Sequence, residues 1–288
     1  MSNIKIYAFA DESSEQIDAQ ISAMQKNSLD GLEIRNVDGT NISDITKEKA
    51  LEVRKKLESA GLITWSLGSP IGKIDIVSDN FQAHLEKFKY TLELGNILNA
   101  RNIRIFSFYI PHDANPNDFR NKVIERLGIF AELAKDSGIT LCHENEKGIY
   151  GDTAPRCLEL HRAVPALKSV FDPANFVQCG QDTLVAWNLL HPYVEYMHIK
   201  DSSSDGTVVP AGLGDGNIPF LASAYLRQGG YVFTIEPHLA DFSGLANLER
   251  AGEKSNIGGK YTFSSNEAAF DTACGTFKKL LEESQLWK

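Results

Sequence analysis

Short runs of β-branched and aromatic residues alternate along the chain with longer segments whose apolar residues recur about every three to four positions. The short runs predict eight strands, at Ile4–Phe9, Gly31–Arg35, Leu62–Leu67, Ile103–Phe108, Thr140–Glu144, Lys168–Asp172, Val194–Ile199 and Tyr231–Glu236. Successive strands begin about 25 to 40 residues apart, which is the length of a strand plus a returning helix. The pattern therefore predicts a repeated strand–helix unit.

The longer segments carry signals for the ends of helices. Ser13–Gln16 has the pattern of a capping box and predicts the start of the first helix. Gly61 and Gly138 suit the residue that follows a helix, and Pro155 suits the first turn of one. The last helix is predicted to follow Ser264–Ser265. The strands are therefore expected to be separated by helices, as parallel strands require.

Eight such units without a break in composition predict one α/β domain over residues 1–288, a single (β/α)8 barrel of the TIM type. A doubly wound open sheet is the alternative. No Gly-x-Gly-x-x-Gly follows the first strand, where the chain reads Ala10-Asp11-Glu12-Ser13. Residues 237–263 form the one long irregular segment, and we expect a lid or an oligomer contact there.

The composition is that of an ordinary globular protein, with 42% hydrophobic and 23% charged residues. The sequence shows no secretory signal and no long apolar run, so we expect a cytoplasmic protein with no membrane partner. A formal net charge of −9 disfavours nucleic acid and favours a small-molecule substrate. The 4 cysteines form no Cys-x-x-Cys pair, so we expect neither a disulfide framework nor a cysteine-based zinc site.

Four consecutive predicted strands end in an ionisable residue: Glu144, Asp172, His198 and Glu236. In a (β/α)8 barrel the carboxyl ends of the strands face the active site, so these side chains are expected to converge. Carboxylates and an imidazole without sulfur suit a hard or borderline divalent ion, namely Mn²⁺, Mg²⁺, Co²⁺ or Zn²⁺. Glu146 points to the same side as Glu144 if the strand continues, and it is the alternative ligand.

Further polar residues lie at the same end of the predicted barrel. Arg35, Lys73 and Lys200 could together bind a carboxylate or phosphate of a substrate, and salt bridges are the alternative. Residues 212–216 have the glycine-rich pattern of a phosphate-binding turn, and a tight loop is the alternative. Three other histidines fall in helical stretches and are expected at the surface: His84, His161 and His191.

These motifs together resemble the xylose isomerase-like superfamily, in its branch of sugar isomerases and epimerases with a TIM-barrel fold. The resemblance rests on Gly31–Arg35, Ser69–Lys73, Glu144-Asn145, Asp172, His198–Asp201 and Ile235-Glu236-Pro237, and so covers nearly the whole barrel. It implies one metal ion, Mn²⁺ in the first place, held by Glu144, Asp172, His198 and Glu236. It also leaves a homo-oligomer open, since oligomers are common in the family.

The resemblance further implies that Glu144 and Glu236 move a proton. One glutamate removes it from the carbon next to a carbonyl, and the other returns it to the neighbouring atom or to the opposite face. The metal stabilises the enediolate between these two steps. The implied enzyme is an isomerase or epimerase of a small sugar or related hydroxy-carbonyl compound. A dehydratase of the inosose or dehydroshikimate type, which expels hydroxide from the β-carbon, is the alternative.

Asn175 departs from the pattern of the family. Many of its epimerases have a histidine three residues after the aspartate that corresponds to Asp172, and that histidine helps to orient substrate oxygens. Asparagine can form a hydrogen bond at this position but cannot carry a proton. We therefore expect Asn175 to bind the substrate, and we expect the substrate to be handled differently than in those epimerases.

Overall fold

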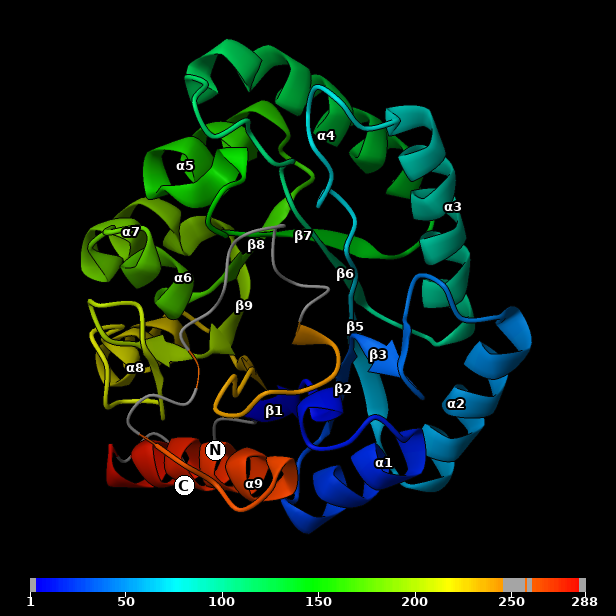
Figure 1. Cartoon of the computed structure of the whole chain (residues 1–288), viewed down its shortest axis with the longest axis vertical. Coiled ribbons are helices and arrows are strands. Elements are labelled where there is room, and N and C mark those ends of the chain that lie inside the picture. The colour runs from blue at the N-terminus through cyan, green and yellow to red at the C-terminus, as the bar shows by residue number, and fades with distance from the viewer. Residues whose placement is uncertain (1–3, 246–256, 258–260, 285–288) are drawn as a thin grey trace.

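A closed barrel of parallel strands forms the centre of the molecule, in the order β1, β12, β9, β8, β7, β6, β5, β2 (Figure 1). The computed structural model describes residues 4–245, 257 and 261–284. The barrel strands are β1 Lys5–Ala8, β2 Gly31–Ile34, β5 Ile63–Gly68, β6 Asn102–Ile105, β7 Thr140–Glu144, β8 Lys168–Phe171, β9 Val194–Ile199 and β12 Val232–Ile235. Each predicted strand overlaps one of these, and the predicted single (β/α)8 barrel is confirmed.

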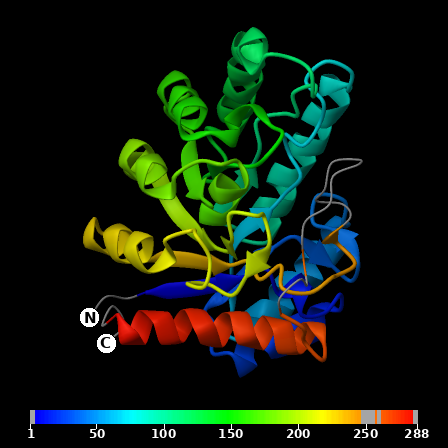
Figure 2. The same cartoon turned by 60° about the vertical axis from the view of Figure 1, so that its left-hand side comes forward.

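Helices surround the barrel on its outside, as Figures 1 and 2 show. They are α1 Ile17–Lys26, α2 Lys47–Ser59, α3 Phe81–Ile97, α4 Arg120–Ala134, α5 Ala154–Ala163, α6 Pro173–Gln178, α7 Thr183–Leu190, α8 Ile218–Arg227 and α9 Asn266–Glu283. Two small hairpins pair β3 Asn36–Val37 with β4 Thr40–Asn41 and β10 Asp201–Ser202 with β11 Val208–Val209. None of the described helices is long and apolar enough to cross a membrane.

The first helix does not begin with the predicted capping box, so that prediction is wrong. Ser13 instead donates its hydroxyl to the carbonyl of Ala10 and closes a 3-10 turn, η1, over Ala10–Glu12. Helix α1 begins at Ile17, whose backbone N–H donates to Asp38 Oδ1 at 2.9 Å. The cap therefore comes from a distant hairpin turn, where no local motif could reveal it.

Other predicted helix ends are confirmed. The hydroxyl of Ser265 accepts from the backbone N–H of Ala268 and caps α9. Pro155 lies in the first turn of α5. Gly61 and Gly138 follow helices with φ of 71° and 74°, a region that costs glycine little and other residues more.

Two of the three histidines expected at the surface are buried instead. His84 accepts a hydrogen bond from the backbone N–H of Gly72 at 2.8 Å, and the ring of His161 contacts the carbonyl of Leu167 at 3.1 Å. Burial lowers the pKa of each imidazole to about 4, so both are neutral at physiological pH. These two histidines are part of the packing between helices and barrel, and only His191 is exposed.

The barrel interior is divided along its axis into an apolar part and a polar part. Tyr7, Trp65, Cys142, Val170, Tyr196 and Val232 form one buried cluster, in which Tyr7 and Trp65 stack with ring centres 5.2 Å apart. Cys142, Val170 and Tyr196 each lie two residues before an ionisable residue of the next layer, as strand alternation requires. The cluster fills the interior toward the amino ends of the strands, so ligands can approach only from the carboxyl ends.

The predicted lid segment, residues 237–263, lies largely outside the described residues. Its described beginning, residues 237–244, contains no strand or α-helix and lies beside Glu12 and Arg35 at the mouth of the barrel. There the backbone N–H of His238 donates to Glu12 Oε2 at 2.6 Å, and the ring of Phe242 lies 4.6 Å from the guanidinium of Arg35. A role as lid or oligomer contact stays a prediction.

Candidate metal centre

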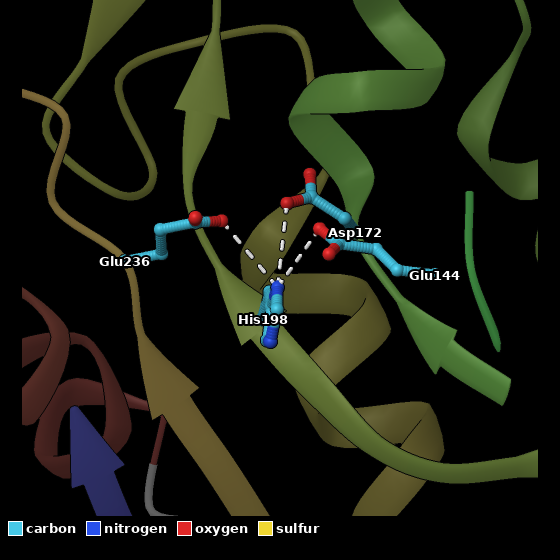
Figure 3. A group of neighbouring side chains, drawn as sticks. All are labelled: Glu144, Asp172, His198 and Glu236. Atoms are coloured by element: carbon cyan, nitrogen blue, oxygen red, sulfur yellow. Dashed lines mark hydrogen bonds and ion pairs between the residues drawn. The ribbon is translucent and has the colours of Figure 1, made fainter. Parts of the chain in front are cut away.

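Glu144, Asp172, His198 and Glu236 meet at the carboxyl ends of β7, β8, β9 and β12 (Figure 3). His198 Nδ1 lies 3.0 Å from Glu144 Oε1, 3.4 Å from Glu236 Oε2 and 3.8 Å from Asp172 Oδ2. One ligand atom from each residue lies within 4.8 Å of the others, and all four side chains are at least 97% buried. We call these four residues the ligand group.

Glu146, the alternative to Glu144, does not join the ligand group. Strand β7 ends at Glu144, and the alternation of side chains ends with it. Glu146 lies further out, with 17% of its side chain exposed, and forms a salt bridge with Lys73 at 3.2 Å. The structure therefore brings Glu144, rather than Glu146, to the other three residues.

The charges around the ligand group do not balance. Six buried carboxyl groups surround the barrel mouth, from Asp11, Glu12, Glu33, Glu144, Asp172 and Glu236, and three buried cations, from Arg35, Arg104 and Lys200. Burial raises the pKa of Glu12 to about 8, so Glu12 carries a proton at neutral pH. With His198 neutral, as a metal ligand must be, these groups carry five negative and three positive charges, and one divalent cation would neutralise the remaining two.

The geometry and the donor atoms of the ligand group suit such an ion. Asp172 Oδ2 is buried and accepts no hydrogen bond, although Lys200 Nζ lies 2.9 Å away. Carboxylate oxygens and a histidine nitrogen, without sulfur, are ligands for Mn²⁺, Mg²⁺, Co²⁺ or Zn²⁺. The residues present therefore fit a divalent metal ion.

Without a metal ion, the buried charges around the ligand group shift the pKa values of its four residues strongly. Burial alone would raise the pKa of Glu144, but His198 and Arg104 outweigh it and lower that pKa to about 2. Burial would likewise raise the pKa of Glu236, but Lys200 and His238 hold it well below its usual range. Burial dominates at Asp172 and raises its pKa, while the carboxylates of Glu144 and Glu33 raise that of His198 against the effect of burial. A metal ion at this site would compete with a proton on His198.

A second set of buried charges shares Glu236 with the ligand group. The Arg35 guanidinium donates to both oxygens of Asp11 at 2.9 and 3.0 Å, to Glu12 Oε1 at 3.0 Å and to Glu236 Oε1 at 3.2 Å. His238 Nδ1 lies 3.3 Å from Glu12 Oε1 and 3.7 Å from Glu236 Oε1. We call Asp11, Glu12, Arg35, Glu236 and His238 the Arg35 cluster. Arg35 was predicted to bind substrate, but its side chain has 0% exposure and lies among carboxylates.

The open space beside the ligand group is a small pocket of about 40 Å³. Lys73, Asn175 and Lys200, all predicted substrate-binding residues, line it, whereas Arg35 does not. Asn175 Nδ2 donates to Glu144 Oε1 at 3.2 Å and to the carbonyl of Asn145 at 2.9 Å, so it also orients a member of the ligand group. Five further ionisable side chains line the pocket: Arg104, Glu146, Lys147, Glu236 and His238.

The glycine-rich turn at residues 212–216 is already filled by a carboxylate of the chain itself. Asp201 accepts hydrogen bonds from the backbone N–H groups of Gly212, Gly214 and Gly216 at 2.8 to 3.1 Å and from that of Ser202 at 2.9 Å. A Cβ atom at Gly214 would lie 2.4 Å from Asp201 Oδ1, which explains the glycine there. The tight-loop alternative is therefore correct, and the turn holds no free phosphate-binding amides among these residues.

Comparison with known proteins places the chain in a family. The family model described as "Xylose isomerase-like TIM barrel" matches residues 21–254, which is well over half of the sequence. The chain belongs to the xylose isomerase-like TIM barrel family. The resemblance inferred from the strand-end motifs is thereby confirmed.

Known proteins that resemble this chain include ones named for different reactions. A 3-dehydroshikimate dehydratase of Bacillus anthracis is 23% identical over 182 residues, which are 62% of this chain and 64% of the relative's length. An L-ribulose 3-epimerase structure superposes with a TM-score of 0.74 at 19% identity, covering 99% of this chain and 96% of the other. The IOLI protein with a bound zinc atom superposes with a TM-score of 0.73 at 15% identity, covering 98% and 99%. The structural likenesses establish the fold alone.

Two residues near the ligand group were not among the predicted site residues. Arg104 donates to Glu144 Oε2 at 3.0 Å, and Glu33 contacts the far side of the His198 ring. Both signals were present in the sequence, because Glu33 lies two residues before Arg35 and Arg104 lies inside a predicted strand. Strand alternation places such residues on the inner face, but it does not say which of them reach the site.

Proposed function

We propose that this member of the xylose isomerase-like TIM barrel family is a metal-dependent isomerase or epimerase of a small sugar or related hydroxy-carbonyl compound. The observation that supports this best is the placement of Glu144 and Glu236. The two carboxylates approach His198 from opposite sides (Figure 3), and both are at least 97% buried. Such an arrangement offers a proton-transferring group to each face of a planar substrate intermediate.

In this proposal Glu144, Asp172, His198 and Glu236 would hold one divalent ion, Mn²⁺ first among Mn²⁺, Mg²⁺, Co²⁺ and Zn²⁺. When bound, the ion acts as a Lewis acid toward the carbonyl and hydroxyl oxygens of a substrate. The imbalance of two negative charges among the buried groups supports one divalent ion per chain. We propose no second ion in the Arg35 cluster, because its carboxyl groups already accept hydrogen bonds from the guanidinium of Arg35.

The chain's own residues carry out the proton transfers. One of the two glutamates removes a proton from the carbon next to the carbonyl, and the electron pair of that C–H bond moves to the carbonyl oxygen. The other glutamate delivers a proton to the opposite face of the same carbon, or to the neighbouring carbon, and regenerates a carbonyl. The lowered pKa values of Glu144 and Glu236 favour the ionised form that the base requires. The glutamate that acts as the acid therefore takes up its proton from solvent beforehand, and the glutamate that acts as the base returns its proton to solvent afterwards.

The substrate is proposed to bind through Lys73, Asn175 and Lys200, which line the pocket. Arg35 would act on the substrate indirectly, through its hydrogen bond to Glu236. A cytoplasmic location and a homo-oligomer remain predictions.

The proposal is tested by removing the metal and following exchange of substrate protons. The protein, stripped with a chelator and verified by elemental analysis, is incubated in D₂O with a panel of ketoses, aldoses and cyclitols. We expect deuterium to enter one substrate carbon only after Mn²⁺ or Co²⁺ is restored. We expect Glu144→Gln and Glu236→Gln to slow exchange by about 10²- to 10⁴-fold. Unchanged turnover after complete metal removal would refute the proposal.

A dehydratase is the second candidate, and the sequence match to a 3-dehydroshikimate dehydratase favours it. The first step is the same proton removal, but the intermediate then loses hydroxide from the β-carbon and no proton returns to carbon. With cyclitol ketones or hydroxylated cyclohexenones as substrates, a rising absorbance of a newly conjugated product would favour this reaction. Reversible deuterium exchange without such a product would favour the isomerase or epimerase.

A further inference from the structure

Glu33 is a fully buried carboxylate that neither belongs to the ligand group nor lines the pocket. It lies on the inner face of β2, with 0% of its side chain exposed. A substrate in the pocket would therefore not meet it directly. An ionisable group so buried needs partners of its own, because burial of an unpartnered charge is costly.

The partners of Glu33 connect it to the metal-facing histidine. Glu33 Oε2 lies 3.1 Å from His198 Nε2, and its Oε1 accepts a hydrogen bond from the hydroxyl of Tyr196 at 2.8 Å. The same hydroxyl lies 3.1 Å from Ser66 Oγ. Phe9 packs edge-on against the His198 ring, with centres 5.3 Å apart. The ring is thus held on the side that faces away from Glu144, Asp172 and Glu236.

The acceptor character of Glu33 decides which nitrogen of His198 can bind a metal. A neutral imidazole has one N–H and one lone pair, and an ionised carboxylate can only accept a hydrogen bond. The N–H therefore belongs on Nε2, beside Glu33, and the lone pair on Nδ1. Nδ1 is the atom that faces Glu144 Oε1 at 3.0 Å and Glu236 Oε2 at 3.4 Å.

We propose that Glu33 is a positioning residue for the metal site, which fixes the ring orientation and the Nε2–H tautomer of His198 and is itself held in place by Tyr196. Carboxylates in this position also make the ligating imidazole a stronger donor, and their loss typically weakens metal binding by about 10- to 100-fold. The inference rests on the metal site of the proposed function and is independent of which reaction the enzyme performs.

The test compares the metal affinity of the full chain with that of Glu33→Gln and Glu33→Ala. Affinity for Co²⁺ and Zn²⁺ is measured by competition with a chromophoric chelator, without any substrate. We expect about 10- to 100-fold weaker binding in both variants. The Glu33→Gln side chain has nearly the same shape, so a loss of affinity there reflects the charge and the hydrogen-bond pattern rather than a cavity. Tyr196→Phe, which removes the hydroxyl that bonds Glu33 and contacts Ser66, is expected to have a smaller effect.

Spectroscopy separates positioning from general loss of structure. In the parent loaded with Zn²⁺, ¹⁵N-histidine spectra should show His198 with a proton on Nε2 and the metal on Nδ1. In Glu33→Gln that signal should broaden or shift, and the visible absorption of the Co²⁺ form should change.

Asp30→Asn is the matched control: Asp30 lies directly before β2, bonds Lys5 and the Ile6 amide, and contacts no member of the ligand group. Its metal affinity and spectra should equal those of the parent.

The outcomes distinguish the inference from the proposed function. If the parent binds no divalent ion tightly, the proposed metal site fails and the inference fails with it. If the parent binds the ion but folded Glu33→Gln and Glu33→Ala proteins bind it equally well, with an unchanged Co²⁺ spectrum, the inference alone is overturned. If affinity falls as expected while no turnover is found with any substrate, the inference stands and the proposed reaction does not.

Discussion

Two groups of buried acids lie side by side at the mouth of the barrel and share Glu236. Its Oε1 atom belongs to the Arg35 cluster and lies 3.2 Å from Arg35 Nη1. Its Oε2 atom belongs to the ligand group and lies 2.8 Å from Lys200 Nζ and 3.4 Å from His198 Nδ1. The two groups are built from the same residue types, but the chain's own cations reach them in different ways.

The difference lies in what the chain supplies to each group. In the Arg35 cluster a planar guanidinium donates to three carboxylates at once, and Glu12, with a pKa raised to about 8 by burial, holds a proton at neutral pH. In the ligand group two separate cations contact the carboxylates: Lys200 reaches Asp172 and Glu236, and Arg104 reaches Glu144. One guanidinium thus ties the Arg35 cluster together, whereas the carboxylate and imidazole atoms of the ligand group converge on one point where a cation from solution could bind.

The largest effect on stability should come from removing Arg35, the internal cation of the Arg35 cluster. In Arg35→Met the side chain keeps much of its bulk but leaves Asp11, Glu12 and Glu236 buried without a guanidinium. We expect a loss of about 3–5 kcal/mol in the free energy of unfolding, measured by urea denaturation of the metal-free protein. A loss below about 1 kcal/mol would show that the cluster is not a structural unit.

The next effect should come from removing a ligand while keeping its shape. Parent protein in Mn²⁺ or Zn²⁺ at about 100 times its dissociation constant should gain about 2.7 kcal/mol of stability, visible in thermal unfolding. Asp172→Asn should lose nearly all of this gain. Glu146→Gln, altered on the same rim but outside the ligand group, should keep it. If Glu146→Gln lost the gain and Asp172→Asn kept it, the ligand assignment would be wrong.

The effect of pH on metal affinity should be smaller than that of removing a ligand and larger than that of altering Asn175. The pKa of His198 in the metal-free protein is raised above its ordinary value by Glu144 and Glu33, against the effect of burial. Metal binding needs the neutral ring, so affinity should increase about tenfold per pH unit while pH lies below that raised pKa. Titrations of the parent at pH 6, 7 and 8, corrected for hydrolysis of the metal ion, measure this slope.

The stability of the metal-free protein should change with pH in the opposite sense. Protonated His198 stabilises the fold fully below the unfolded pKa of about 6.5, and this contribution is lost as pH rises through the higher folded-state pKa. Urea unfolding in the presence of a chelator would reveal it as a decline with increasing pH. If metal affinity, in the titrations at pH 6, 7 and 8, did not change with pH, the assignment of His198 as a ligand would be contradicted.

The smallest effect should come from Asn175. Its Nδ2 donates to Glu144 Oε1 at 3.2 Å, so Asn175→Ala removes one hydrogen bond from a ligand without removing charge. We expect a cost of about 1 kcal/mol, or roughly fivefold weaker metal binding. Asn175→Asp adds a fourth carboxylate beside the ligand group and should instead alter affinity in a strongly pH-dependent way. Equal affinity of parent and Asn175→Ala would restrict Asn175 to substrate binding.

The strands and the ligand group were predictable because they depend on simple periodicities. Alternating apolar runs locate the strands, and parallel strands of one barrel bring their carboxyl ends together, so Glu144, Asp172, His198 and Glu236 had to converge. The choice between Glu144 and Glu146 needed the exact end of β7, which a two-residue period cannot supply.

The residues around the ligand group were less predictable, because their partners come from distant segments. Arg35 meets Asp11 and Glu12 from a 3-10 turn that carries no repeating pattern. Asp38 caps α1 across a hairpin, so the local sequence at Ser13–Gln16 suggested the wrong helix start. Glu33 could have been noticed from its place two residues before Arg35, but its link to His198 depends on the closure of the barrel.

The carboxylate of Asp201 permanently occupies the backbone amides of the glycine-rich turn at residues 212–216. The three glycine amides and that of Ser202 hold its carboxylate as they could hold an anion from solution. A group joined covalently to the end of β9 has an effective concentration at the turn that no dissolved phosphate ester can match. A phosphate group from solution would therefore find the amides of this turn already bonded to Asp201, so a phosphorylated ligand would have to be recognised by other residues.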